Sequence, residues 1–267
     1  MAYIVCAAAR VIKKISSDNN VLNVTSVDDE LFVSLERDQV AVYSINDYQL
    51  LRHLNLPGFK PDVLSDMTSC VRHKCLYMSD FDNSCIHRYH LASSAISKWS
   101  VPGKPVGLSV TSSCNLLVTC RGKPNKLVEL SADSGQCVRE IALESDIVKP
   151  WHGVQLTNGQ LVVCHGQWED GDLHRVCVVG DDGKVTRSYG GSDVGQLDRP
   201  RHLAVDKDSQ FIFVADQDNN RVVLLSPTLE FVRYVSERLS CECRLYLHQA
   251  TRRLFVGQWD YVTVIQL

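Results

Sequence analysis

A short apolar segment recurs six times along this chain of 267 residues, and no other feature constrains the fold as strongly. In every copy three apolar residues are followed by one small residue, and successive copies begin 40 to 51 residues apart. A run of this kind, bounded by polar residues, predicts a strand that is buried on both faces. The small residue indicates a crowded position where neighbouring sheets converge. The six copies are Leu31–Ser34, Leu76–Ser79, Leu116–Thr119, Leu161–Cys164, Ile212–Ala215 and Leu254–Gly257.

Three further strand-like runs surround each copy. Around the fifth copy they are Arg201–Asp206 before it and Arg221–Leu225 and Phe231–Val235 after it, separated by Asp, Asn, Gly or Pro. Four strands in a unit of about 44 residues match the size of a β-propeller blade. Segments with helical periodicity are no longer than about ten residues, which argues against a helical solenoid. The sequence therefore predicts an all-β protein, a six-bladed β-propeller with four-stranded antiparallel blades.

The two ends of the chain are predicted to close the ring. The last unit ends after the strand Tyr261–Leu267, one strand short of a complete blade. The surplus apolar run Arg10–Ile15 precedes the first complete unit, so an N-terminal strand can complete the last blade and remove two free sheet edges. We expect a single domain over 1–267, with blades at about 17–56, 57–101, 102–144, 145–191, 192–237 and 238–267 plus 1–16.

Composition limits the cellular setting and the partners. The apolar runs are about five residues long, far short of the ~20 needed to span a bilayer, so we expect no membrane partner. The N-terminal apolar stretch lacks a charged leader region and is interpreted as a strand rather than a signal peptide. The 11 cysteines are odd in number and several lie within apolar runs, which favours reduced thiols and a cytoplasmic protein. A net charge of −3 provides no overall field that would attract a polyanion.

The fifth unit carries the most specific motif. It reads Gly195–Asp206, with Pro200 before an apolar strand that ends in Val-Asp, and then Phe213–Val222, which contains Val-Ala-Asp and Asn-Arg-Val. This unit resembles the NHL repeat, and together with the spacing of the other units the resemblance covers nearly the whole chain. It implies a propeller similar to the C-terminal NHL domain of TRIM-NHL proteins, which use one face to bind RNA or protein partners. The sequence has no RING, B-box or coiled-coil pattern, so ubiquitin ligase activity would require domains outside it.

The expected binding surface is the face made by the loops that lead into the inner strands and by the turns between second and third strands. A basic residue directly precedes the proline in four of these loops, and the third unit adds basic turn residues. Nearby aromatic residues suit either base stacking or protein contacts. Because neighbouring turns are acidic, we favour a protein partner and keep RNA binding through the basic arc of the third to fifth blades as the alternative. The candidate contact residues are Lys60, Lys104, Arg121, Lys123, Lys126, Lys149, Trp151, Trp168, Arg199, Arg201 and Trp259.

A second alternative is a metal-dependent hydrolase or lyase with a histidine site at the channel mouth. His152 and His202 each lie two residues after the proline of their loop, and His165 ends a second strand, so three imidazoles could approach one zinc ion. Other blades carry Val63, Gly107 and Arg244 at the matching position, and a guanidinium disfavours a cation. The sequence contains no HExxH, GxSxG or P-loop motif. We therefore predict a monomeric, non-catalytic binding platform with no catalytic residue, no metal, no cofactor and no small-molecule substrate.

Overall fold

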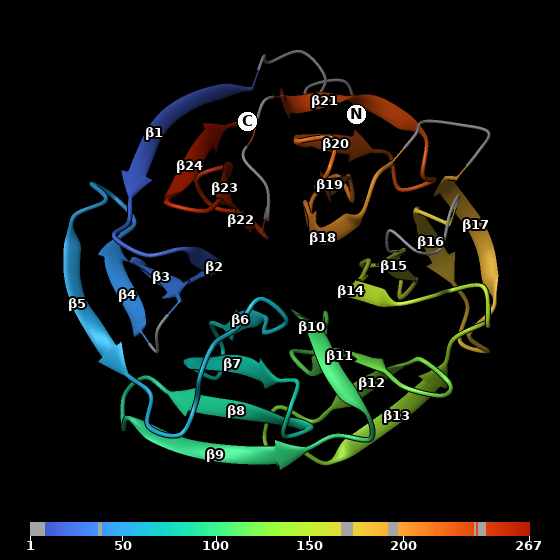
Figure 1. Cartoon of the computed structure of the whole chain (residues 1–267), viewed down its shortest axis with the longest axis horizontal. Coiled ribbons are helices and arrows are strands. Elements are labelled where there is room, and N and C mark those ends of the chain that lie inside the picture. The colour runs from blue at the N-terminus through green and yellow to red at the C-terminus, as the bar shows by residue number, and fades with distance from the viewer. Residues whose placement is uncertain (1–8, 37–38, 167–172, 192–196, 238, 240–243) are drawn as a thin grey trace.

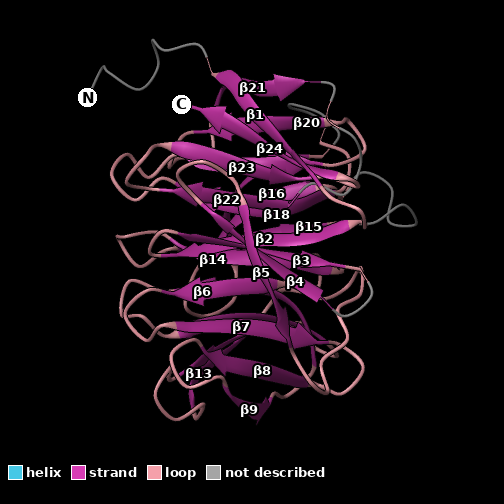
Figure 2. Ribbon diagram, turned by 90° about the vertical axis from the view of Figure 1, so that its left-hand side faces the viewer, coloured by secondary structure: helices cyan, strands magenta, loops and turns pink. Residues whose placement is uncertain are grey.

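The computed structural model describes residues 9–36, 39–166, 173–191, 197–237, 239 and 244–267, and it confirms the predicted fold class. Six four-stranded antiparallel sheets stand around a central axis as the blades of a β-propeller (Figure 1). Seen from the side, the loops gather on two opposite faces of the ring (Figure 2). Every regular element of the described residues is a strand, so they include no helix long and apolar enough to cross a membrane.

Each blade is a meander in which the first strand lies nearest the axis and the fourth forms the outer edge (Figure 1). The first three blades comprise β2 (Val21–Val27), β3 (Glu30–Leu35), β4 (Gln39–Ser44) and β5 (Leu50–Asn55); β6 (Met67–Cys70), β7 (Cys75–Asp80), β8 (Cys85–His90) and β9 (Ala95–Ser100); β10 (Lys104–Val110), β11 (Leu116–Arg121), β12 (Lys126–Leu130) and β13 (Cys137–Ala142). The next two comprise β14 (Pro150–Gln155), β15 (Leu161–His165), β16 (Arg175–Val179) and β17 (Val185–Gly190); β18 (Pro200–Val205), β19 (Ile212–Asp216), β20 (Arg221–Leu225) and β21 (Phe231–Glu237).

The sixth blade closes the ring with strands from both ends of the chain. It contains β22 (Arg244–His248), β23 (Arg253–Gly257), β24 (Tyr261–Gln266) and, as its outer strand, β1 (Arg10–Ser16). β1 pairs antiparallel with β24, and Ile15 is only 6% exposed because it packs into the cluster between the sixth and first blades. This pairing confirms the prediction that an N-terminal strand completes the last blade.

The hydrophobic core is divided among the contacts between neighbouring blades. Between the fourth and fifth blades, for example, Val162 and Val214 are fully buried in one cluster. Burying side chains of this size contributes roughly 1.5–3 kcal/mol each, so the apolar segments of the repeat hold the ring together. The small residue after each apolar triplet is buried as well, and it lies near the C-terminal end of the second strand. Eight cysteines of the described residues are free thiols, and six of them are buried.

Candidate functional site

One residue from each blade lies near the start of its inner strand or, in the second blade, directly before it, opposite the small residue of the repeat. In the fourth blade His152 is the ladder partner of Cys164, and in the fifth His202 is the partner of Ala215. In the second blade this position belongs to Asp66, whose N–H donates to Ser79 Oγ at 2.7 Å and whose carbonyl accepts from Ser79 N–H at 2.9 Å. We call these six residues the axial ring: Asn23, Asp66, Gly107, His152, His202 and Arg244.

The axial ring corrects the sequence-based alignment of the second blade, which placed Val63 at this position. Asp66 lies five residues after Pro61, whereas His152 lies two residues after Pro150, so the second blade has three additional residues in this loop. Sequence reasoning therefore missed the one carboxylate of the ring. The available signal was the polar pair Ser65-Asp66 directly before a short strand.

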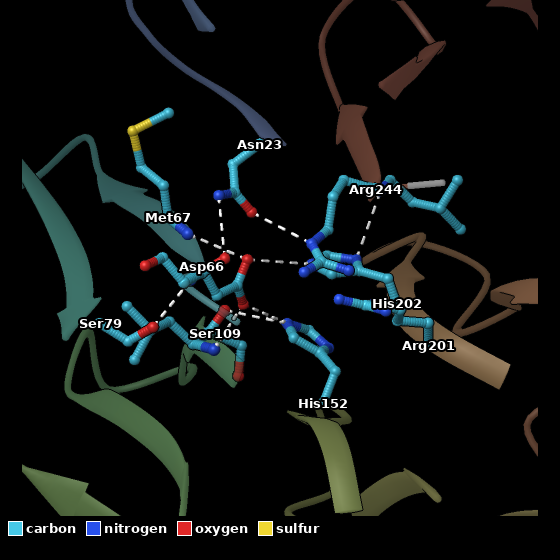
Figure 3. A network of polar contacts seen from close by, with 12 residues as sticks. Asn23, Asp66, Met67, Ser79, Ser109, His152, Arg201, His202 and Arg244 are labelled. Atoms are coloured by element: carbon cyan, nitrogen blue, oxygen red, sulfur yellow. Dashed lines mark hydrogen bonds and ion pairs between the residues drawn. The ribbon is translucent and has the colours of Figure 1, made fainter. Parts of the chain in front are cut away.

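The carboxylate of Asp66 is buried at the centre of the ring and contacts three other blades (Figure 3). Its Oδ1 accepts the backbone N–H of Met67 at 2.9 Å, and its Oδ2 accepts that of Leu108 on β10 at 2.7 Å. His202 Nε2 lies 3.5 Å from Oδ1, and His152 Nε2 lies 3.5 Å from Oδ2. One carboxylate thus joins the second blade to the third, fourth and fifth.

The loop between β5 and β6 lies at one end of the channel, where arginine side chains from other blades reach it. The carbonyl of Val63 accepts hydrogen bonds from Arg201 of the fifth blade and from Arg244 of the sixth, the latter at 3.2 Å. Arg244 also donates to Asn23 Oδ1 at 3.2 Å, and Asn23 donates to the carbonyl of Ser65 at 3.1 Å. Because the second and fifth blades face each other in a ring of six, the side chain of Arg201 spans the channel at this end. We call the side with this loop the upper face and the opposite side the lower face.

The protonation states of the axial-ring side chains depend on their burial and on the charged groups beside them. The rings of His152 and His202 stack with centroids 3.9 Å apart. Burial, followed by the nearby His202, lowers the pKa of His152 from 6.5 to about 3, so His152 is neutral at neutral pH. Burial alone would raise the pKa of Asp66, but His202, and then His152 and Arg244, outweigh it and hold this pKa below its ordinary value of 3.8. Asp66 is therefore an ionised carboxylate in the middle of the protein.

The axial ring brings together two of the three histidines considered for a metal site. Asp66, His152 and His202 present ligand atoms within 4.8 Å of one another. However, Nε2 of His152 lies 3.0 Å from the carbonyl oxygen of Leu108, which can only accept, so this nitrogen carries the proton and a metal bound there would take away the donor of that buried carbonyl. His165 does not join them, since its Nε2 faces a cysteine thiol of its own blade at 3.4 Å. The residues present fit a network of hydrogen bonds better than a metal site.

Below the axial ring the channel opens on the lower face as a cavity of about 720 Å³. His152 and His202 lie among its lining residues, and side-chain hydroxyls line much of its wall. These hydroxyls bond between blades: Thr25 Oγ1 lies 2.7 Å from Ser69 Oγ, and Ser109 Oγ donates at 2.8 Å to a backbone carbonyl of the fourth blade. The wall of the cavity is therefore part of the seam between blades.

Several of the predicted contact residues have charges that are already engaged within the protein. Lys126 pairs with a glutamate of β13 at 2.8 Å, and Arg199 pairs with an aspartate of the turn before β20 at 2.5 Å. Lys104 Nζ donates to the backbone carbonyl of a neighbouring turn at 2.8 Å. Lys60 and Lys123 are exposed. Two basic residues of the predicted arc, Lys126 and Arg199, are thus paired with carboxylates of the protein itself.

Trp151 is predicted from the sequence to be a surface contact, and the structure corrects this because its side chain is buried. The residue is 7% exposed, and its ring lies between Arg121 and Arg201, whose Cζ atoms are 3.8 and 4.1 Å from the ring centroid. Arg201 is itself only 6% exposed. Cation–π stacking and burial make these three residues internal packing. Of the remaining predicted contacts, Lys149 is half-buried, Trp259 is 42% exposed and Trp168 lies outside the described residues.

Gly107 belongs to the axial ring because the position has no room for a side chain. A Cβ there would lie 2.3 Å from the carbonyl oxygen of Trp151 and 2.8 Å from the Cα of His152. Since backbone atoms would have to move, Gly107→Ala should lower the free energy of unfolding by about 1–3 kcal/mol in chemical denaturation. Gly122→Ala, in an exposed turn where a Cβ would lie 3.2 Å from the carbonyl oxygen of Pro124, is the milder comparison and should destabilise the protein less than Gly107→Ala. Equal stability of the two variants would contradict this packing.

Comparison with known proteins establishes the fold class. Neither a protein-family model nor a curated protein matches the chain. Similar solved structures include a streptogramin B lyase (TM-score 0.70, 10% identity, 96% of this chain and 97% of that chain covered) and virginiamycin B lyase from Staphylococcus aureus (0.66, 10%, 97% and 99%). A third is hydrazine synthase from Kuenenia stuttgartiensis (0.68, 12%, 95% and 97%). At these identities the likeness shows a six-bladed β-propeller and no activity, and the NHL resemblance stays a prediction.

Proposed function

We propose that the protein is a non-catalytic binding platform that recognises a protein partner on its upper face. The observation that carries this proposal is the loop between β5 and β6, which lies at the upper end of the channel and leaves Val63 45% exposed. Two guanidinium groups hold the loop by its backbone carbonyl, so this apolar side chain stands on a fixed base. Trp259, in the turn between β23 and β24, adds a second exposed apolar side chain. Apolar and aromatic anchors on a rigid surface are typical of protein-recognition sites.

The charges of the upper face favour a protein over RNA. A nucleic-acid site needs several lysine and arginine side chains that can reach phosphates. Arg121 and Arg201 instead stack on a buried tryptophan, and Lys126 is paired with a carboxylate. The exposed Lys60 and Lys123 suit a partner segment that combines apolar and acidic side chains. RNA binding through the third to fifth blades remains the alternative that the experiment below must separate.

Catalysis in the lower-face cavity is the other alternative. The hydroxyls of its wall bond between blades, and Nε2 of His152 donates to a backbone carbonyl. Groups committed to such bonds are poorly placed to accept a proton or to ligate a metal. We therefore infer that the channel joins the blades and that recognition takes place on the upper face.

Val63→Asp tests the proposal, because it puts a charge on the apolar contact without changing the backbone carbonyl that holds the loop. We expect this variant to lose at least about tenfold in partner enrichment when affinity capture from lysate, with nuclease added, is quantified by mass spectrometry. Val138→Asp is the matched control, since Val138 is 55% exposed on the outer strand β13, away from the upper face. This control should capture the partner as the wild type does.

Two results would count against the proposal, and a third would call for a second pair of variants. Equal capture by the two valine variants would remove the upper face as the site. Release of the partner by nuclease, with a steep loss of binding as salt rises, would indicate RNA instead. A lower unfolding midpoint of Val63→Asp than of Val138→Asp would attribute the loss to folding, and in that case Lys60→Glu with Lys123→Glu, both at exposed positions, repeats the test.

A further inference from the structure

A second cluster of metal-ligating side chains lies in the second blade, at the turn between β7 and β8. Asp80 ends β7 and is the ladder partner of Cys85, the first residue of β8. His87 follows two residues later on the same strand, so its side chain points to the same side as Cys85. Nε2 of His87 lies 3.0 Å from Asp80 Oδ2, and the ligand atoms of all three residues lie within 4.8 Å of one another.

The equivalent place in the fifth blade shows what is unusual about this cluster. There Asp216 is the ladder partner of Arg221, whose Nε donates to Asp216 Oδ2 at 2.6 Å. In the second blade Cys85 stands where the fifth blade has this arginine. The Asp80 carboxylate therefore faces a thiol and an imidazole in place of a guanidinium.

We propose that Asp80, Cys85 and His87 form a binding site for a zinc ion, with one carboxylate oxygen, one thiolate sulfur and one imidazole nitrogen as ligands. Tetrahedral zinc with bonds of ~2.0–2.3 Å places its ligand atoms about 3.4–3.6 Å apart, so only small side-chain movements are needed. A fourth position is left to water. The side chain of Asp80 is 12% exposed, which gives an ion access from the turn.

The surroundings of Asp80 hold it in a ligating orientation. Asn83 donates to Asp80 Oδ1 from its backbone N–H and from its side-chain amide, each at 3.0 Å. Hydrogen bonds of this kind orient a ligating carboxylate and raise metal affinity. Nδ1 of His87 is buried without a hydrogen-bond partner among the described residues, so it can take the imidazole proton when Nε2 binds the metal.

Binding of one zinc ion releases one proton from the protein to solvent. The Cys85 thiol gives its proton to solvent and becomes a thiolate, while the His87 proton moves from Nε2 to Nδ1 and stays on the ring. Zinc affinity should therefore rise with pH.

Titration of the purified full chain with Co²⁺, followed by competition with Zn²⁺, tests the site. We expect one Co²⁺ per chain, with a thiolate-to-cobalt charge-transfer absorption and the visible bands of tetrahedral cobalt, and their loss when Zn²⁺ is added. Cys85→Ser should abolish the charge-transfer band and weaken Zn²⁺ binding at least tenfold, roughly the effect of losing one well-placed metal contact. Cys137→Ser, at an exposed thiol on β13, should keep both.

The outcomes separate this site from other metal binding. A charge-transfer band that persists in Cys85→Ser, or its absence from the wild-type protein, would overturn the proposal. The axial ring has no thiol among its six residues, so Co²⁺ bound there would lack the band. If Cys85→Ser does not fold, Asp80→Asn takes its place and should weaken Zn²⁺ binding by about tenfold while the band remains. Loss of partner capture is not expected from Cys85→Ser, so the two proposals fail independently.

Discussion

Asp66→Ala should lower the free energy of unfolding by about 3–5 kcal/mol, because it removes one partner from a buried network of charges and hydrogen bonds. The backbone N–H groups of Met67 and Leu108 would lose their acceptor. His202 and Arg244 would remain buried without a carboxylate between them. Since the same carboxylate joins the second blade to the third, fourth and fifth, the loss should affect the whole ring rather than one sheet.

Urea denaturation followed by tryptophan fluorescence measures this effect. Asp208→Ala is the matched control, since Asp208 is an exposed aspartate in the turn between β18 and β19, and it should change stability by less than about 0.5 kcal/mol. Asp66→Asn separates charge from shape, because the amide is nearly the size of the carboxylate but carries no charge. A loss below about 1 kcal/mol in Asp66→Ala would mean that the blades are held by apolar packing alone.

Stability should also fall as the pH is lowered below 6.5, starting well above the range in which most carboxylates are protonated. His152 has an ordinary pKa of 6.5 in the unfolded chain, whereas in the folded protein burial and then His202 lower it to about 3. The unfolded chain therefore binds a proton that the folded protein rejects, and the contribution is complete above pH 6.5 and lost as the pH falls. One such group lowers the free energy of unfolding by about 1.4 kcal/mol for each pH unit within this window. His165 acts in the same direction, since burial and then Arg175 lower its pKa to about 4.

His152→Gln should remove the contribution of one titrating group from the slope of unfolding free energy against pH. Glutamine can still donate to the carbonyl of Leu108, but it does not titrate. The free energy of unfolding, measured by urea denaturation at several pH values between about 4 and 6.5, gives the slope. His53→Gln, at an exposed position on β5, should leave it unchanged. An unchanged slope in His152→Gln would show that this imidazole is protonated in the folded protein.

The architecture was predictable because its signals are local. The apolar triplet of each unit indicates a strand that is buried on both faces. The interval between copies indicates how many strands form a blade. The pairing of Arg10 with Gln266 could be anticipated because the last unit is one strand short and an unassigned apolar strand precedes the first.

The candidate site was less predictable because it depends on loop length and on the path of long side chains. The sequence identified His152 and His202 as neighbours but paired them with Val63, since the three additional residues of the second-blade loop shift the register. Trp151 was expected on the surface because its strand begins next to an exposed loop. Its burial results from two arginines of the adjacent blades, which cover both faces of the ring.

The sequence by itself determined six blades of four strands and a ring closed by the N-terminal strand, because strand periodicity and repeat spacing act along the chain. Only the tertiary structure decided that a carboxylate lies at the centre of the ring and that the lower face opens into a cavity. The reason is that the axial contacts join residues far apart in sequence: Arg244 and Asn23, which share a hydrogen bond, are 221 positions apart. Their meeting depends on the closure of the whole ring.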